Sequence, residues 1–367
     1  RPGPVWIDIP MDVQGAQFTT ITELIEKADR PLILAGNGIN CADARKEFKD
    51  FVNATNIPVV TSYNGVDLIE SNDVNFVGRV GIKGTRAGNF AIQNCDLLIV
   101  IGCRLPVPVT GYNYKTFARE ATVIVIDIDK DEHSKNTVEI DWFIHRDAKD
   151  FFNTTIFDRE KNDWNEICRL WKKKWPICPS ENSSEKVDLY YFMKVLNDLK
   201  RADDVVISDA GSAFYVCSQA TDIQYQQRYI TSSSQAEMGF TIPACIGAAF
   251  AKDGEVIGVT GDGSFMMNLQ ELQTIKHYNL PIKLFVWNND GYLSIRTTQK
   301  KFFEGREIGT DSESGVSIPN IRKVTESFGI EYALADADGL EGAIKYTLDY
   351  SGPVVCEVFC DKWQEVV

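Results

Sequence analysis

Gly261-Asp262-Gly263-Ser264 and, 24 positions after its serine, the pair that begins at Asn288 are the segments that decide the fold of this chain. Each follows an apolar run typical of a buried strand, at 255–260 and 281–287. Between them, apolar residues from 267 to 275 recur at helical spacing. The pattern predicts a strand–helix–strand unit, with an acidic residue at one strand end and amides at the next.

The two strand ends predict a binding site. In open α/β sheets, ligands bind at the carboxyl ends of the strands, so we expect Asp262 and Asn289 to converge. Carboxylate and amide oxygens are the hard ligands that Mg²⁺ prefers, often together with phosphate oxygens. The alternative is structural, because Asp and Gly favour tight turns and an Asn pair can occupy a second turn.

The spacing and residue types resemble the signature of thiamine diphosphate enzymes, in which Gly-Asp-Gly is followed after a similar gap by Asn-Asn. The resemblance implies that Mg²⁺ is held by Asp262, Asn289 and the main-chain carbonyl of Gly291. It further implies that Ser264 contacts the diphosphate. The residues of these segments that it places around thiamine diphosphate are Gly261, Gly263, Ser264, Asn289, Gly291 and Tyr292.

Two further segments fit the same cofactor cleft. Gly211-Ser212 follows an apolar run where acetolactate synthases carry a turn that reaches the diphosphate. Its main-chain amides can bind phosphate, and its alternative role is to cap a helix. Met238 stands where those relatives have a methionine beneath the bend of the cofactor. The resemblance implies that Met238 is a wedge that forces the folded cofactor shape; the alternative is an ordinary core methionine.

Composition narrows the functional classes. The chain has 367 residues, which is enough for two domains, and a formal net charge of −14, which disfavours a nucleic-acid partner. No apolar run is long enough to cross a bilayer. Nine cysteines without a Cys-x-x-Cys pair favour a reducing compartment. We therefore expect a cytoplasmic protein, without a membrane partner, that acts on small molecules.

The order of the apolar runs predicts the fold class: α/β, with two doubly wound, mostly parallel sheets. The runs are apolar throughout, which is typical of parallel strands covered on both faces, and helical segments separate them. They lie at 31–35, 58–61, 96–101 and 122–127, and again at 205–208, 255–260, 281–287 and 353–358. We expect a Rossmann-like central domain at 19–155, a linker at 156–186 and a thiamine diphosphate-binding domain at 187–367.

Residues 1–18 resemble the end of the amino-terminal, pyrimidine-binding domain of the acetolactate synthase group. The alternative is a strand that begins an ordinary domain. In that group, a glutamate of the amino-terminal domain, usually from the partner subunit, activates the cofactor. We can assign that role to no residue here. The resemblance therefore implies a homodimer or homotetramer as the parent state, and a chain that is inactive toward keto acids on its own.

A flavin is the open question in the central domain. Gly36-Asn37-Gly38 follows a strand, but Cys41 stands where a dinucleotide fingerprint has its third glycine, so a simple turn is favoured. The resemblance to acetolactate synthases implies FAD in a structural role. Lys83 and residues 105–108 depart from the family pattern, while Asp127 and Asp129 are placed to meet a ribose or flavin edge. The sequence leaves FAD possible.

The first hypothesis for function is transfer of a two-carbon unit from pyruvate to a 2-keto acid, dependent on thiamine diphosphate and Mg²⁺. Alternatives within enzymes are a related protein that uses another acceptor, such as a keto-sugar, and a simple 2-keto acid decarboxylase. A flavin- or nicotinamide-dependent oxidoreductase is a further option. Outside enzymes, the alternative is a non-catalytic cofactor-binding subunit.

Overall fold

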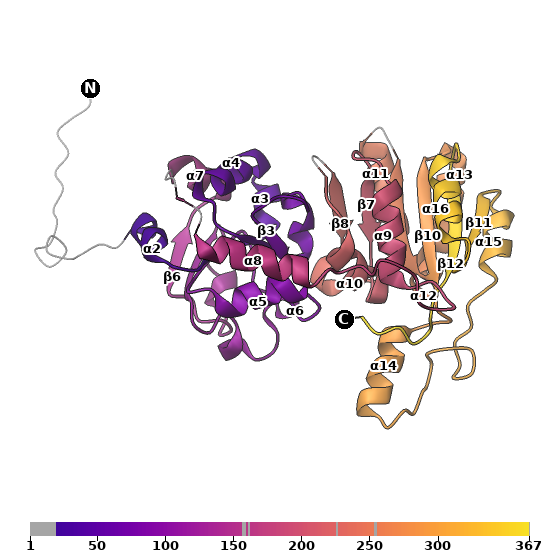
Figure 1. Cartoon of the computed structure of the whole chain (residues 1–367). Coiled ribbons are helices and arrows are strands. Elements are labelled where there is room, and N and C mark those ends of the chain that lie inside the picture. The colour runs from indigo at the N-terminus through magenta and orange to yellow at the C-terminus, as the bar shows by residue number, and fades with distance from the viewer. Residues whose placement is uncertain (1–19, 156–158, 161, 225–226, 253–254, 367) are drawn as a thin grey trace, which may run out of the picture.

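A computed structural model describes residues 20–155, 159–160, 162–224, 227–252 and 255–366. Two α/β domains lie side by side (Figure 1). Each contains a six-stranded sheet, and every pairing between neighbouring strands is parallel. The fold class predicted from the apolar runs is therefore confirmed. Residues 1–18, which resemble the end of an amino-terminal domain, lie outside the described residues.

The central domain has the strand order β3-β2-β1-β4-β5-β6. Its strands are β1 (Pro31–Ala35), β2 (Val59–Thr61), β3 (Phe76–Arg79), β4 (Leu97–Ile101), β5 (Thr122–Asp127) and β6 (Trp142–His145). Its helices and 3₁₀ turns are α2 (Ile21–Lys27), α3 (Gly38–Cys41), α4 (Arg45–Thr55), η1 (Tyr63–Leu68), α5 (Arg86–Asn94), α6 (Val107–Thr110), η2 (Tyr114–Thr116), η3 (Glu132–Ser134), α7 (Ala148–Thr154) and α8 (Asp163–Lys174). One face of the sheet packs against α5 and α8, and the other packs against α2, α4 and α7.

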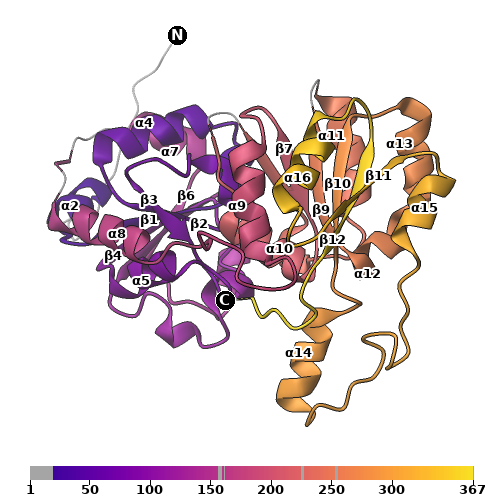
Figure 2. The ribbon, with the colours of Figure 1, turned by 45° about the vertical axis from the view of Figure 1, so that its right-hand side comes forward.

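The second domain has the order β11-β12-β10-β9-β7-β8. Its strands are β7 (Val205–Ser208), β8 (Arg228–Thr231), β9 (Val256–Gly261), β10 (Ile282–Asn288), β11 (Glu331–Ala335) and β12 (Val354–Phe359). Its helices and 3₁₀ turns are α9 (Leu189–Leu199), α10 (Gly211–Ala220), η4 (Ser233–Gln235), α11 (Thr241–Ala251), α12 (Asp262–Phe265), η5 (Met266–Glu271), α13 (Leu272–Tyr278), α14 (Leu293–Phe302), α15 (Ile321–Ser327) and α16 (Leu340–Asp349). Helices α9, α10 and α16 cover one face, and α11, α13 and α15 cover the other. In both views α14 projects away from the sheet (Figures 1 and 2).

The helix expected between the two signature segments is broken. After β9 the chain forms α12, η5 and α13 in succession, and Asn268 inside η5 has a non-helical φ of −135°. Only the C-terminal part of the segment, with Leu272 and Ile275, is a helix packed on the sheet. The break lies within η5, after the short helix α12 that begins at Asp262 at the end of β9.

The two domains share buried contacts. Arg79 at the end of β3 is buried, and its guanidinium donates to the carbonyl oxygens of Gln219 (2.9 Å) and Thr221 (2.7 Å). Phe214 of α10 packs into the core of the central domain, 5.1 Å from the ring of Tyr63. Because a buried guanidinium is costly to leave unpaired, these contacts fix α10, which begins at the candidate site, against the central domain.

The linker helix α8 belongs structurally to the central domain. Trp164 is buried, and its ring lies 5.6 Å from that of Trp171, which in turn contacts Phe90 of α5.

In the described parts of the chain, no helix combines the length and apolar character needed to span a membrane. All nine cysteines lie in described residues, and each is a free thiol.

Candidate functional site

The carboxyl ends of β7, β9 and β10 meet at one edge of the second sheet, because these three strands are parallel neighbours. A cavity of about 500 Å³ opens there. It is lined by all ten residues that the sequence predicts for the cofactor and metal: Gly211, Ser212, Met238, Gly261, Asp262, Gly263, Ser264, Asn289, Gly291 and Tyr292. Its other lining residues are Ala210, Ala213, Tyr215, Ala236, Trp287, Leu293, Ser294 and Ile295.

Asp262 provides the buried charge of this cavity. Its Oδ1 accepts the N–H of Gly263 (2.6 Å), and its Oδ2 accepts the N–H groups of Asn289 (3.1 Å) and Gly291 (2.9 Å). Burial raises the pKa of Asp262 to about 6, against the lowering effect of these three hydrogen bonds. A buried carboxylate is costly without a compensating charge, so the site is suited to a cation.

The side chain of Asn289 supports the same conclusion. Its Oδ1 is buried and has no hydrogen-bond partner. A buried polar atom without a partner is uncommon and calls for an explanation such as an ion. Among the described residues there is no cluster of three His, Cys, Asp or Glu side chains, so a metal here would be held by one carboxylate with amide and carbonyl oxygens. That donor set fits Mg²⁺, which prefers a few oxygen ligands together with substrate phosphates.

Glycines at two positions permit this geometry. A Cβ on Gly263 would lie 2.2 Å from the ring of Tyr292, so the tyrosine packs directly against the signature turn. Gly291 has a φ of +112°, and a Cβ there would lie 2.1 Å from the carbonyl oxygen of Thr310. Side chains at Gly291 are disfavoured both by this conformation and by this contact, so the turn that presents its carbonyl requires glycine.

Gly211 and Met238 belong to two different segments that both line the cavity. Gly211 begins α10 with a φ of +57°, and Ser212 follows it in the lining. Met238 is 38% exposed and lines the cavity. It is therefore not the ordinary core methionine of the alternative interpretation, and its side chain is available to a ligand.

The side chain of Ser264, which we expected to contact the diphosphate, lines the cavity but is hydrogen-bonded to the protein on two sides. Its hydroxyl donates to Oδ2 of Asp209 (2.6 Å) and accepts the N–H of Gly239 (2.7 Å). Asp209, at the end of β7, is fully buried and was missed by the sequence analysis. The only sequence signal for it is its place directly after an apolar strand.

Arg296 is a second residue that the sequence analysis missed as part of the site. It is fully buried, and its guanidinium donates to the carbonyl oxygens of Asp290 (2.7 Å), Asn289 (2.8 Å) and Lys362 (2.9 Å). Its charge also lowers the pKa of Asp262. Arg296 thus holds the turn at 289–290 through its carbonyl oxygens and does not itself line the cavity.

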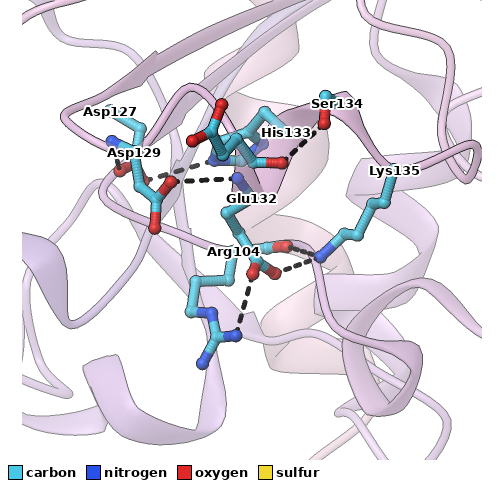
Figure 3. Close-up of polar contacts among 8 residues, drawn as sticks. Arg104, Asp127, Asp129, Glu132, His133, Ser134 and Lys135 are labelled. Atoms are coloured by element: carbon cyan, nitrogen blue, oxygen red, sulfur yellow. Dashed lines mark hydrogen bonds and ion pairs between the residues drawn. The ribbon is translucent and has the colours of Figure 1, made fainter.

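Two candidate flavin residues of the central domain, Asp127 and Asp129, belong to a cluster of polar contacts within that domain (Figure 3). Glu132 accepts from Arg104 (2.9 Å) and pairs with Lys135, and these bonds lower the pKa of Glu132 to about 2. Asp127 lies 3.4 Å from His133 and accepts the N–H of Asp129 (3.0 Å). Arg104 and Lys135 are therefore both paired with the one carboxylate of Glu132.

The main-chain N–H groups of the glycine turn after β1 are likewise bonded within the central domain. The N–H groups of Gly36 and Gly38 donate to the carbonyl oxygens of Ile101 (2.9 Å) and Gly102 (2.8 Å). A Cβ on Gly36 would lie 2.2 Å from the oxygen of Gly102. These glycines let two strand ends approach each other, and the turn does not fit a dinucleotide phosphate bound by its amides.

Comparisons with known proteins agree with the geometry. Two family models match the chain: "Thiamine pyrophosphate enzyme, central domain" over residues 18–154, and "Thiamine pyrophosphate enzyme, C-terminal TPP binding domain" over residues 209–358. Similar proteins include the acetolactate synthase isozyme 2 large subunit of Escherichia coli (strain K12), which is 31% identical over 390 residues and covers 100% of this chain and 70% of the relative.

Two further relatives have comparable similarity. The probable acetolactate synthase large subunit of Methanococcus aeolicus is 31% identical, with coverage of 98% of this chain and 67% of the relative. The acetolactate synthase large subunit of Porphyra purpurea is 30% identical, with coverage of 98% and 66%. The chain thus spans about two thirds of the length of these relatives.

Proposed function

This chain belongs to the thiamine pyrophosphate enzyme family, and on this premise we propose that it binds thiamine diphosphate and Mg²⁺ and takes part in transfer of a two-carbon unit from pyruvate to a 2-keto acid. One observation carries the proposal. The cavity at the ends of β7, β9 and β10 combines the buried carboxylate of Asp262 with the unpartnered buried oxygen of Asn289.

Each part of the cavity has a proposed role. Asp262, Asn289 and the carbonyl of Gly291 would hold Mg²⁺, with Gly211, Ser212 and the Gly261–Gly263 turn beside the diphosphate. Tyr292 would border the cofactor, and Met238 would hold it in its folded shape. When bound, thiamine diphosphate supplies an electron sink for decarboxylation of a 2-keto acid.

The remaining lining residues would keep water from the reacting carbon. Trp287, Leu293 and Ile295 contribute apolar surface to the cavity, and a dry site strengthens the electrostatic interactions within it. No glutamate lies among the described lining residues. An activating glutamate would therefore come from elsewhere in the protein or from a partner subunit, and this chain alone would be inactive. We propose a cytoplasmic homodimer or homotetramer as the working state.

A second candidate is a relative that accepts a neutral carbonyl, such as a keto-sugar, or one that only decarboxylates. Among the described residues that line the cavity, none is Lys, Arg or His. Arg104 of the central domain is paired with Glu132. The carboxylate of a 2-keto acid acceptor would lack a cationic partner from these residues, which favours a neutral acceptor.

The test is to incubate the full-length protein with thiamine diphosphate, Mg²⁺ and ¹³C-labelled pyruvate and to identify the products by NMR. Acetolactate supports the two-carbon transfer to a keto acid. Acetaldehyde alone supports the second candidate, which a keto-sugar added as acceptor would then divide into transferase and decarboxylase. Unconsumed pyruvate, with failure of a panel of other 2-keto acids, would overturn both in favour of a non-catalytic subunit.

A further inference from the structure

We propose that Ser264 and Asp209 position Met238 and that the hydroxyl of Ser264 is not a diphosphate ligand. This inference rests on the proposed function, because it assigns roles toward thiamine diphosphate bound in the cavity. It is carried by one continuous chain of hydrogen bonds, from the carboxylate of Asp209 through the hydroxyl of Ser264 to the main-chain N–H of Gly239, the residue after Met238.

The hydroxyl of Ser264 has a single proton, and it donates this proton to Asp209 in a hydrogen bond. A serine hydroxyl can donate one hydrogen bond, and that of Ser264 points to Oδ2 of Asp209 at 2.6 Å. A diphosphate at neutral pH offers mainly acceptor oxygens, so it would have to compete with a buried carboxylate for that proton. The hydroxyl oxygen also accepts from Gly239 at 2.7 Å. Ser264 is therefore occupied on both sides.

Asp209, at the start of this series of hydrogen bonds, is held in place by several donors. Its Oδ2 also accepts from the hydroxyl of Thr260 (2.9 Å) and the N–H of Thr241 (3.3 Å), and its Oδ1 accepts the N–H of Ala210 (2.7 Å). Burial raises the pKa of Asp209, and the convergent donors oppose that rise by favouring the ionised form. The carboxylate thereby joins the ends of β7 and β9 to the start of α11.

Gly239 transmits the anchoring to Met238. Its N–H is held by Ser264, and its carbonyl oxygen accepts from Nδ2 of Asn268 (2.9 Å). Its φ is +85°, and a Cβ would lie 2.7 Å from Cβ of Met267, so neither the conformation nor the space suits another residue. With both polar groups of Gly239 held by side chains, the backbone that carries Met238 into the cavity has one position.

The two possible roles of Ser264 predict different losses. In the full-length protein, Ser264→Ala is measured for thiamine diphosphate affinity by titration and for hydrogen–deuterium exchange at C2 of the saturated cofactor by NMR. If Ser264 positions Met238, Ser264→Ala should slow exchange at C2 by about a hundred-fold, which is the loss expected for a group misplaced by about 1 Å. The Kd for thiamine diphosphate should then change by less than about three-fold. A Kd raised about ten-fold or more, the worth of a lost charged hydrogen bond, with exchange unchanged, would overturn the proposal.

One further variant, Asn268→Leu, keeps the test decisive if Ser264→Ala does not fold, and a double variant extends the test if it does. Asn268→Leu removes the bond to the Gly239 carbonyl without touching the cavity lining, and it should slow exchange with little change in Kd. In a Met238→Ala background, Ser264→Ala should add no further loss, because both act through one side chain; additive losses would contradict the proposal.

Thr260→Val is the matched control. It removes a buried hydroxyl from the same carboxylate without breaking the path to Gly239, so exchange should stay within about three-fold of the wild type. An equal loss in Thr260→Val and Ser264→Ala would mean a merely structural role and would overturn the proposal. Failure of the wild type to bind thiamine diphosphate at all would be a different result, because it would refute the proposed function itself.

Discussion

Asp262 and Arg296 hold the same turn through its opposite polar groups. Asp262 accepts the main-chain N–H groups of Asn289 and Gly291, while Arg296 donates to the carbonyl oxygens of Asn289 and Asp290. Both side chains are buried, and their opposite charges lie on the two sides of the turn. The turn is therefore held in shape by the protein, and the side-chain oxygen of Asn289 is left for a ligand.

Replacing Asn289 should separate metal binding from folding. In Asn289→Leu, the Mg²⁺-dependent affinity for thiamine diphosphate should fall by at least ~10-fold, the lower end of losses seen when metal-site groups are removed. Titration at several Mg²⁺ concentrations measures it. Asn288→Ala is the control, because Asn288 bonds to Glu357 and to the N–H of Asp290 in the same turn but does not line the cavity, so it reports loosening of the turn without loss of a ligand. The same loss in both variants would speak against Asn289 as a ligand.

Arg296→Met should loosen the turn at 289–291 and destabilise the domain. It leaves the carbonyl oxygens of Asn289, Asp290 and Lys362 without their donor, and unsatisfied buried groups cost ~1–3 kcal/mol each. We expect the free energy of unfolding in urea to fall by ~3 kcal/mol or more. Arg322→Met, which removes an exposed arginine paired with Glu326, should change it little. Equal unfolding midpoints for Arg296→Met and wild type would refute the supporting role.

Gly291→Ala should be strongly destabilising. The φ of +112° and the 2.1 Å approach of a Cβ to the Thr310 carbonyl both oppose a side chain, and backbone strain of this kind alone costs ~1–3 kcal/mol. Thermal unfolding measures the loss. Gly247→Ala in α11, where a Cβ meets nothing within 4 Å, should be neutral or slightly stabilising. A Gly291→Ala protein as stable as wild type would show that the turn adapts.

The ion-pair cluster of the central domain should give an acid-dependent stability. The pKa of Glu132 in the folded protein, about 2, lies below its ordinary 4.5. Its stabilising effect is therefore complete above about 4.5 and is lost as the pH falls toward about 2. Wild type should be more stable than Glu132→Gln at pH 6, and the difference between the two should shrink steadily as the pH falls from about 4.5 toward about 2. A difference that does not change with pH would contradict the pairing with Arg104 and Lys135.

The sequence revealed the inner strands of both sheets and missed the outer ones. The apolar runs correspond to β1, β2, β4 and β5 and to β7, β9, β10 and β12, of which β1, β4, β9 and β10 have buried neighbours on both sides. The missed strands, β3, β6, β8 and β11, are the edge strands of the two sheets. Three of these four strands are incompletely buried: β6 has no buried residue, β8 has one and β11 has two. Strand β3 is buried throughout, but Gly78 and Arg79 interrupt its apolar residues. The apolar runs of these four strands are therefore shorter than those of strands covered on both faces.

The candidate site was predictable where its chemistry rests on local spacing. The segments around Asp262 and Asn289 contain a periodic pattern and a fixed gap, and the structure brings them to one cavity. Asp209 and Arg296 have no such signal, because their importance comes from contacts across 51 positions to Thr260 and 66 positions to Lys362. A single sequence gives no information about such long-range partners.

The measurement that tests the central claim most directly is calorimetric titration of the full-length protein with thiamine diphosphate, with and without Mg²⁺, in the wild type and Asp262→Ala. We expect binding that requires Mg²⁺ in the wild type and is abolished in Asp262→Ala, while the variant keeps its native circular dichroism spectrum. Binding that is independent of both Mg²⁺ and Asp262 would contradict the assignment of this cavity as the metal–diphosphate site.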